Sequence, residues 1–297
     1  MVITVTGSTG TIGSELVRLL SAVGAPTRAV HRSAKSAHAL KGVVWLKADL
    51  RDESVVEPVL AGTTRLFLLT GNETGFGKLQ IDTIRAAERL GVQHVVKLSA
   101  LGASNHSSST IAREHWEVEQ ALQQSTMAWT MLRPHAFMQN WLGDVAESVR
   151  AEDAIYSPIA DGRVPFIDTR DIAAVAVEVL LNPEAHVGRR YFLTGGAAVG
   201  LADVAVALSD VTGRTVSYRA ISMDEARSRM ESRGVPAQLI DATLAIAAYQ
   251  KAGGATAKVS DSVQRILGRA PLTIRDFARD YADQFAATTR EASVARS

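Results

Sequence analysis

Three glycines follow the first apolar run of the chain at a regular spacing. Gly7, Gly10 and Gly13 stand three residues apart, after residues 2–6 and before an amphipathic stretch. Glycine permits a tight turn, a close approach of backbone to a pyrophosphate, and close packing of a helix on a strand. The start of that helix would add free N–H groups and partial positive charge. We therefore predict a dinucleotide-binding loop, with an ordinary glycine turn as the alternative.

Basic residues follow the second predicted strand, residues 27–31. An acid at this place would bind the ribose hydroxyls of NAD, whereas a cation pairs with the 2′-phosphate of NADP. Arg32 and Lys35 follow the strand and no acid does. The sequence therefore predicts NADP(H) as the cofactor, and a solvated basic turn is the alternative. Asp49, which follows the third predicted strand, is either close to the adenine or a plain turn residue.

Many short-chain dehydrogenases carry a catalytic tyrosine and a lysine four residues apart on one helix, and this chain lacks that pair. The corresponding predicted helix contains His115 instead. In the helix predicted over residues 111–123, His115 shares the inward face at helical spacing. Glu119 lies one turn further on, where it could orient the His115 ring. We expect His115 to contact the ribose or the nicotinamide; a core histidine and a proton donor are the alternatives. His135 is a second candidate for assisting catalysis.

Apolar and aromatic residues follow the strand predicted over residues 128–132. Ligands of open α/β sheets lie beyond the carboxyl ends of the strands, so this segment is expected to border a substrate. Phe137 and Trp141 are four residues apart and would share a helix face, which suits a flat aromatic acceptor. The alternative is that they pack the small lobe. The predicted substrate-binding residues are Phe137, Met138, Asn140, Trp141 and Phe166.

The elements that must position these residues alternate between strands and helices. This alternation predicts an α/β, Rossmann-type doubly wound parallel sheet with a small, mostly helical C-terminal lobe. The predicted sheet strands are residues 2–6, 27–31, 43–46, 65–70, 94–98, 128–132 and 191–194. The predicted helices include residues 53–60, 78–90, 111–123, 137–149 and 172–181. Two further strands are predicted over residues 164–167 and 216–221.

These elements predict a division into two domains and a tail. Residues 1–152 plus 167–194 are expected to form the dinucleotide-binding domain. Residues 153–166 plus 195–285 are expected to form the smaller, substrate-side lobe, and residues 286–297 a disordered tail.

The composition excludes several classes of protein. The net charge of +1 gives no electrostatic case for nucleic acid or an anionic membrane as a partner. The chain has no cysteine, which excludes disulfides, thiolate metal sites and cysteine nucleophiles. The histidines show no metal-ligand spacing, so no metal site is predicted. No apolar stretch is long enough for a membrane helix, and a cytoplasmic location is expected.

Several motifs occur along the chain: GSTGTIG, AVHRSAKS, KLSALGAS, EHWEVEQAL, TMLRPHAFMQNWL and FIDTRDIA. Together they resemble the NmrA-like branch of the atypical short-chain dehydrogenase/reductases, over roughly the first two-thirds of the chain. LRPHAFMQN is the most specific part. His115 with Glu119 is similar to the His-x-x-x-Glu of the quinone-reductase and triarylmethane-dye-reductase members, whereas other members carry lysine where His115 stands.

The resemblance implies bound NADP(H) and a set of residues that contact it. These are Gly7, Thr9, Gly10, Thr11, Ile12, Gly13 and Arg32 and, by position at the ends of later strands, Leu69, Thr70, Ser99, Ala100, His115 and Pro134.

The resemblance also implies one of two functions, because some members reduce quinones, dyes or activated double bonds and others sense NADP(H) through a protein partner. We predict an NADPH-dependent reductase that passes hydride to a small conjugated acceptor, mainly through proximity and desolvation. The sensor is the alternative, and DNA binding is disfavoured. The fold alone leaves epimerisation or dehydration open, and the sequence leaves a homodimer open.

Overall fold

The computed structural model describes residues 1–32, 39–73 and 75–287. Within them the chain forms two compact units. Unit 1 consists of Met1–His135, Thr169–Leu193 and Asp261–Ala270. Unit 2 consists of Ala136–Asp168, Thr194–Ser260 and the residues from Pro271 onward. Lys35 and the tail from residue 288 lie outside the described residues.

Unit 1 contains a seven-stranded sheet in which all neighbouring strands are parallel. The strand order is β3-β2-β1-β4-β5-β6-β8, so the direction of winding reverses between β1 and β4. This is the doubly wound arrangement that the sequence predicts, and the reversal is the point where such sheets bind ligands. The strands are β1 (Ile3–Val5), β2 (Thr27–His31), β3 (Val43–Lys47), β4 (Arg65–Leu68), β5 (His94–Leu98), β6 (Ala128–Pro134) and β8 (Arg189–Leu193).

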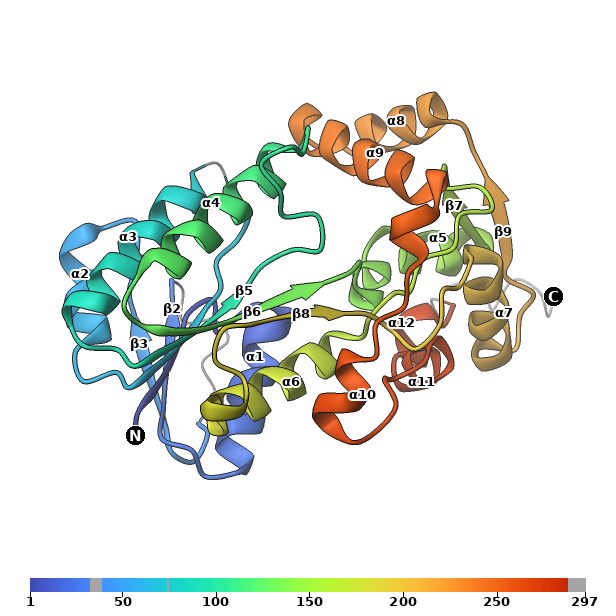
Figure 1. Cartoon of the computed structure of the whole chain (residues 1–297). Helices are drawn as coiled ribbons and strands as arrows, with labels where there is room; N and C mark the ends of the chain where they lie inside the picture. The colour runs from blue at the N-terminus through green and yellow to red at the C-terminus, as the bar shows by residue number, and fades with distance from the viewer. Residues whose placement is uncertain (33–38, 74, 288–297) are drawn as a thin grey trace. The chain divides into compact units, whose positions relative to one another are not determined.

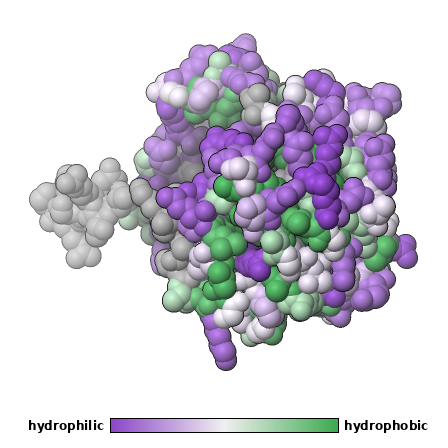
Figure 2. All heavy atoms as spheres, turned by 90° about the vertical axis from the view of Figure 1, so that its left-hand side faces the viewer, coloured by the Kyte–Doolittle hydropathy of each residue, from purple (hydrophilic) through white to green (hydrophobic). Residues whose placement is uncertain are grey.

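The central strands are largely buried because helices cover both faces of the sheet. Every residue of β1 and β5 is buried. The edge strand β3 is only half-buried, and its Val44 is 58% exposed. Figure 2 shows the side of the molecule that lies at the left of Figure 1, where hydrophilic surface predominates and is interrupted by hydrophobic patches.

Two layers of helices cover the sheet of unit 1 (Figure 1). Helices α2, α3 and α4 pack against one another on one face, and α1 packs against α6 on the other. Buried apolar residues such as Leu66, Ile84 and Leu122 form the core beneath the first layer. The helices of unit 1 are α1 (Thr11–Ala22), α2 (Glu53–Leu60), α3 (Phe76–Arg89), α4 (Thr110–Gln124), α6 (Thr169–Leu181), η3 (Pro183–Ala185) and α10 (Ser262–Leu267).

Unit 2 has a core of its own, built around Trp141, Ile155, Leu208, Phe277 and Phe285. A two-stranded parallel sheet joins β7 to β9. The elements of unit 2 are η2 (Met138–Leu142), α5 (Asp144–Glu152), β7 (Ala154–Ser157), α7 (Leu201–Thr212), β9 (Ser217–Ala220), α8 (Met223–Ser232), α9 (Ala237–Ala252), η4 (Gly254–Ala257), α11 (Ile274–Asp280) and α12 (Ala282–Phe285).

Two sequence predictions for unit 2 are wrong in detail, and one strand was not predicted. Residues 164–167 form only isolated bridges, because Pro165 has no N–H to donate to a ladder. The single helix predicted over residues 137–149 is a 3₁₀ turn and then α5, separated by Gly143 with ψ −114°. Strand β7 was not predicted, since its four residues gain stability only by pairing with β9.

The predicted division into domains also differs from the two units. Residues 136–152 belong to unit 2, because Met138, Trp141 and Val149 are part of its core. Residues 261–270 belong to unit 1, where α10 packs against α6 and β8. Arg269 strengthens that attachment with an ion pair to the buried carboxylate of Asp171, at 2.7 Å.

Candidate functional site

The glycine loop connects β1 to α1 and depends on glycine at two places inside the protein. Gly7 has a φ of +61°, which disfavours side chains, and a Cβ there would lie 2.8 Å from the Leu69 carbonyl oxygen. A Cβ on Gly13 would lie only 2.1 Å from the Gly7 carbonyl oxygen. Glycine at these positions therefore permits the turn and brings the first turn of α1 against the loop, as the spacing predicts.

Gly10 has a different reason to be glycine. Its φ of −78° is open to any residue, and the nearest atom to an added Cβ would be the Gly7 carbonyl oxygen at 3.4 Å. The protein itself therefore has room for a side chain at this position. Gly10 also precedes the first turn of α1, whose initial N–H groups come before the first helical bond, from Ser14 N to Gly10 O at 2.9 Å. An exposed glycine beside such N–H groups fits the close approach of a phosphate.

Hydroxyl groups tie the loop to the ends of neighbouring strands. Thr6 Oγ1 donates to the Leu69 carbonyl at 2.8 Å and accepts from the Leu69 N–H at 2.9 Å. Ser8 Oγ donates to the Val30 carbonyl at 2.7 Å. The loop therefore has a fixed position relative to β2 and β4. Of the other predicted loop residues, Thr9 is half-buried, Thr11 is exposed and Ile12 is buried.

Four charged side chains after β2, β3 and β4 form what we call the exposed charge cluster: Arg32, Asp49, Arg51 and Glu73. The Arg32 guanidinium donates to both Glu73 carboxylate oxygens, at 3.0 and 3.3 Å. Arg51 pairs with Asp49 and lies 3.8 Å from Glu73. The hydrogen bond from Arg51 holds the pKa of Asp49 at about 2, and that from Arg32 lowers the pKa of Glu73.

Asp49 was predicted either to lie close to the adenine or to be a turn residue, and the structure supports the turn. Its carboxylate accepts from the Arg51 N–H at 3.1 Å as well as from the guanidinium, which is the arrangement of a turn residue. Its contact with adenine remains a prediction. Lys35, the second predicted cation, lies outside the described residues.

Two buried polar atoms near the ends of β4 and β5 have no hydrogen-bond partner within the described ranges: Ser99 Oγ and Gln80 Oε1. Gln80 Nε2 donates to Thr70 Oγ1 at 2.6 Å, so Gln80 points to the end of β4. An orphaned buried hydroxyl or amide oxygen costs free energy unless a ligand or water satisfies it. Ser99 and Thr70 were both predicted to contact the cofactor; Gln80 was not predicted.

The other residues predicted to contact the cofactor, Leu69, Ala100 and Pro134, lie at the carboxyl ends of their strands, along the same edge of the sheet. Leu69 and Ala100 are half-buried, and Pro134 is buried at the end of β6. The Ser99 N–H donates to the Leu132 carbonyl at 2.7 Å and the Leu101 N–H to the Pro134 carbonyl at 3.2 Å, which extends the pairing with β6 beyond the end of β5. Their contacts with a cofactor remain predictions.

His115 lies in α4 and is only 5% exposed, which agrees with the inward position that helical spacing predicts. The Phe76 ring packs on it with centroids 4.8 Å apart. The Lys97 ammonium, from β5, lies 3.1 Å from His115 Nδ1. Burial and the nearby cations lower the pKa of His115 to about 2, so the imidazole is neutral throughout the physiological range.

Glu119 does not orient His115, contrary to the sequence prediction. Its fully buried carboxylate accepts two hydrogen bonds from Arg133, at 2.7 and 2.5 Å, and lies 3.4 Å from Arg190. These guanidiniums reach Glu119 from β6 and β8, which the helical spacing of α4 could not indicate. We call Lys97, His115, Glu119, Arg133 and Arg190 the buried charge cluster.

Sequence reasoning missed Lys97, although the strand contains a signal. HVVKL is the middle of a fully buried strand, and lysine is rarely buried without a specific reason. A lysine in such a run therefore marks either an ion pair or a functional group. The Glu73 and Arg51 partners of the exposed charge cluster carry no comparable signal, because charged residues are common in loops.

The predicted substrate residues lie in unit 2, with different degrees of burial. Met138, Trp141 and Phe166 are buried in the core of that unit, where Trp141 contacts the Phe166 and Phe277 rings at 4.8 and 5.4 Å. Phe137 precedes the 3₁₀ turn and is half-buried, so it shares no α-helical face with Trp141. Asn140 is exposed. Core packing accounts for the three buried residues, and substrate contact remains a prediction.

His135 directly follows β6 and is 8% exposed. Its N–H donates to the Leu193 carbonyl at 2.9 Å, which continues the pairing of β6 with β8. Its role in catalysis remains a prediction.

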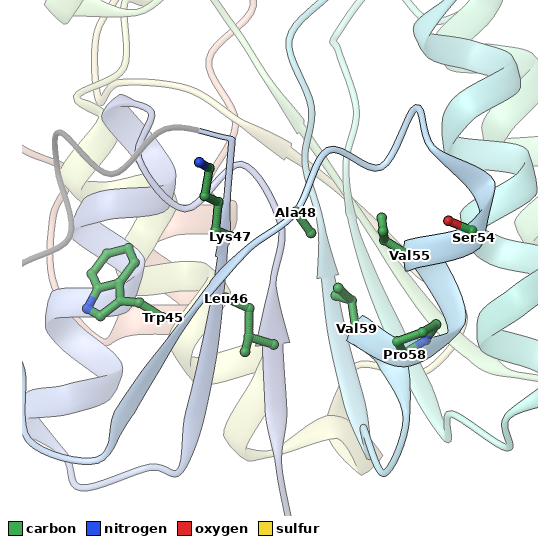
Figure 3. Close-up of a pocket in the computed structure, with 8 residues that line it drawn as sticks. All are labelled: Trp45, Leu46, Lys47, Ala48, Ser54, Val55, Pro58 and Val59. Carbon is green, nitrogen blue, oxygen red and sulfur yellow. The ribbon is translucent and has the colours of Figure 1, made fainter.

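An open pocket of about 360 Å³ lies between β3 and α2 (Figure 3). Its walls include Trp45, Leu46, Val55 and Val59, and none of the predicted site residues lines it. Among the residues that the structure describes, no group of three His, Asp or Glu side chains could hold a metal ion. A search of the same residues found no helix that is long and apolar enough to cross a membrane.

Comparison with known proteins shows the family of the chain. Residues 1–278 match the NmrA-like family. The chain belongs to this family. It is 38% identical, over 96% of its length and 99% of the relative, to the NAD(P)H azoreductase of Xenophilus azovorans.

Two solved structures are similar over nearly the whole chain. The NADPH-dependent quinone oxidoreductase of Escherichia coli in complex with NADPH has a TM-score of 0.83 and 26% identity, and covers 94% of this chain and 99% of that one. The Citrobacter sp. triphenylmethane reductase in complex with NADP(H) has a TM-score of 0.83 and 23% identity. The similarity covers 95% of this chain and 100% of that one, and it shows that the two chains share a fold.

This NmrA-like chain is an NAD(P)H-dependent oxidoreductase with NADP(H) as its cofactor. The described residues fit that group on three independent observations. Gly10 leaves space beside the start of α1, Arg32 offers a guanidinium after β2, and Ser99 Oγ is buried without a partner.

Proposed function

We propose that the chain reduces a quinone, an azo compound or another small conjugated acceptor at the carboxyl edge of the unit 1 sheet. The observation that carries this proposal is the row of polar groups along that edge: the first N–H groups of α1, the exposed Arg32 guanidinium in its exchangeable pair with Glu73, and the unpartnered Ser99 Oγ. The names of the azoreductase and quinone oxidoreductase relatives support the acceptor class.

Each of these groups has a distinct role in binding the cofactor. The start of α1 binds the pyrophosphate through its N–H groups and its dipole. Arg32 binds the 2′-phosphate by a bidentate, charge-assisted contact, exchanging Glu73 for the phosphate. Ser99 Oγ and Thr70 Oγ1 bind the ribose next to the nicotinamide. When bound, NADPH supplies a hydride from C4 of its nicotinamide.

The neutral state of His115 agrees with this acceptor class. Because its pKa is about 2, His115 cannot act as a charged acid at neutral pH. It can donate only the proton of a neutral imidazole, which is a weak acid. Acceptors that delocalise the electrons they receive need little acid assistance, so positioning and exclusion of water supply most of the rate. A simple ketone needs a stronger proton donor.

The test is NADPH oxidation by the purified protein with a panel of quinones, azo dyes, triarylmethane dyes and simple ketones. We expect saturable turnover with conjugated acceptors, little with ketones, and a higher kcat/KM with NADPH than with NADH. A control without acceptor corrects for oxidation by oxygen. Tight NADPH binding without turnover of any acceptor would contradict the proposal and favour a cofactor sensor instead. A homodimer remains a prediction, to be tested by light scattering.

A further inference from the structure

A buried lysine is in direct contact with the candidate catalytic histidine. Lys97 has no exposed surface, and its Nζ donates to the carbonyl of Leu98 at 2.5 Å. The same Nζ lies 3.1 Å from His115 Nδ1. Both contacts are within unit 1, and the second joins β5 to α4.

This contact decides which nitrogen of His115 carries the proton. When Lys97 is protonated, its ammonium has three donors and no acceptor, so Nδ1 accepts and the imidazole proton stays on Nε2. The hydrogen bond that the structure shows for the His115 ring among the described residues is at Nδ1, not at Nε2. The Phe76 ring restrains the imidazole from the side. His115 can therefore donate a proton from Nε2, while Lys97, a second proton donor, contacts its other ring nitrogen, Nδ1.

The surrounding charges leave Lys97 without a direct carboxylate partner. Glu119 of α4, the buried acid whose charge acts on Lys97, is engaged by Arg133 of β6 and Arg190 of β8. Glu114, also of α4, accepts from the Gly77 N–H of α3 instead. Burial lowers the pKa of Lys97 to about 7, while Glu119 partly opposes this. A group of this kind is close to half-protonated at neutral pH, which is the optimum for proton transfer.

We propose that Lys97 and His115 form a two-residue proton relay that serves the reduced acceptor. This inference rests on the proposed function, because it needs an acceptor that takes up a proton. It assigns Lys97 as a positioning and proton-supplying residue that acts through His115, which alone would touch the acceptor.

With a quinone as the acceptor, the protons that the relay gives up and takes back balance. A quinone that has gained a hydride carries one oxygen as an anion. That oxygen takes the proton of His115 Nε2, and Nδ1 takes a proton from Lys97 Nζ, which becomes a neutral amine. The reset returns the Nδ1 proton to Lys97 while a solvent proton binds Nε2. One solvent proton is used per quinone, and the product is a neutral hydroquinone.

A cationic triarylmethane dye provides the matched control reaction. Hydride addition to its central carbon cancels the positive charge and gives a neutral product with no proton required. The relay therefore assists reduction of the quinone and has no part in reduction of the dye. The ratio of the two turnover rates reports the relay separately from cofactor binding, folding and hydride transfer.

The experiment measures this ratio in the wild type, Lys97→Met and Lys78→Met. Lys78 is an exposed lysine of α3 that pairs with Asp82. We expect Lys97→Met to lower the quinone-to-dye ratio about tenfold or more, and Lys78→Met to leave it unchanged. In the wild type, quinone turnover should fall as pH rises above about 7, with a solvent isotope effect that the dye does not show. Equal losses with both acceptors, or an unchanged ratio, would overturn the relay.

Two further measurements keep the inference testable if Lys97→Met folds poorly. His115→Gln retains an N–H donor without a second ring nitrogen, and should lower the same ratio. Side-chain nitrogen NMR of the protein without cofactor should show the Nε2–H tautomer of His115; the opposite tautomer would overturn the relay. A wild type that binds NADPH but reduces neither acceptor would overturn the proposed function, and the relay with it.

Discussion

The two charge clusters of unit 1 differ in their exposure to water. In the exposed charge cluster, Arg32 and Glu73 are 55% and 58% exposed, so their ion pair is weak and easily exchanged. In the buried charge cluster, Glu119 is fully buried and Arg133 is 11% exposed. Breaking that pair leaves a charge without solvation. The comparison indicates that the exposed cluster can exchange a carboxylate for a phosphate, whereas the buried cluster keeps its groups in fixed positions.

The largest effect is expected at the centre of the buried charge cluster. Glu119→Ala would leave the Arg133 and Arg190 guanidiniums without their carboxylate. We expect a loss of about 3–5 kcal/mol in the free energy of unfolding, measured by urea denaturation. Glu73→Ala is the matched control in the exposed cluster and should change stability by less than about 1 kcal/mol. Similar losses in the two variants would contradict the distinction between the clusters.

Next in size is a pH effect that arises from His115. Its pKa is about 2 in the folded protein and 6.5 as the reference for the unfolded chain. Between these values the unfolded chain binds a proton that the folded protein does not bind. Stability that is present above pH 6.5 is therefore lost as pH falls, by up to about 1.4 kcal/mol per pH unit.

The measurement compares the free energy of unfolding of the wild type and His115→Asn at pH 7.5 and pH 5. The wild type should lose more stability than the variant between the two pH values. The acidic and basic groups that do not contact His115 are common to both proteins and cancel in the difference. A difference between the proteins that stays the same at both pH values would show that His115 titrates normally in the folded protein.

In the exposed charge cluster, Arg32→Asp replaces the predicted phosphate ligand by a like charge. We expect NADPH to bind about ten- to a hundredfold more weakly, because a charge-assisted contact is lost. NADH, which lacks the 2′-phosphate, should change far less. Fluorescence titration with both cofactors measures this, with Arg18→Asp, at an exposed pair on α1, as the control. An equal loss for both cofactors would place the 2′-phosphate elsewhere.

The smallest expected effect comes from Glu73, which competes with the phosphate for Arg32. Glu73→Gln removes the competing charge while keeping the size of the side chain. NADPH should bind up to about fivefold more tightly, since an exposed ion pair contributes only about 0.2–1 kcal/mol. NADH should be unaffected in the same titration. Weaker NADPH binding would indicate that Glu73 itself supports the cofactor site.

Features that depend on residues close together in sequence could be predicted, and contacts between distant elements could not. The glycine loop was predictable because Gly7 and Gly13 meet each other within a few residues. The doubly wound parallel sheet was predictable from the alternation of strands and helices. The contact of Lys97 with His115 joins two elements across the layer between sheet and helix, and so does the pairing of Glu119 with Arg133. Neither has a local sequence signature beyond the buried position of Lys97.

Unit 2 was predicted less well for a related reason. Strand β7 exists through its pairing with β9, and Ile155 pairs with Tyr218 far along the chain. Residues 164–167 have the apolar pattern of a strand, but Pro165 limits their pairing to isolated bridges. Local pattern was sufficient where neighbours in sequence make the structure, and insufficient where distant segments do.

The most direct test of the account is a steady-state comparison of Arg32→Asp and His115→Gln with NADPH and one quinone. We predict that Arg32→Asp raises the KM for NADPH and leaves kcat close to the wild type, since the 2′-phosphate is remote from the reacting atoms. His115→Gln should lower kcat and leave the KM for NADPH nearly unchanged. Variants that change the same parameter, or a wild type that does not oxidise NADPH with a quinone, would contradict the account.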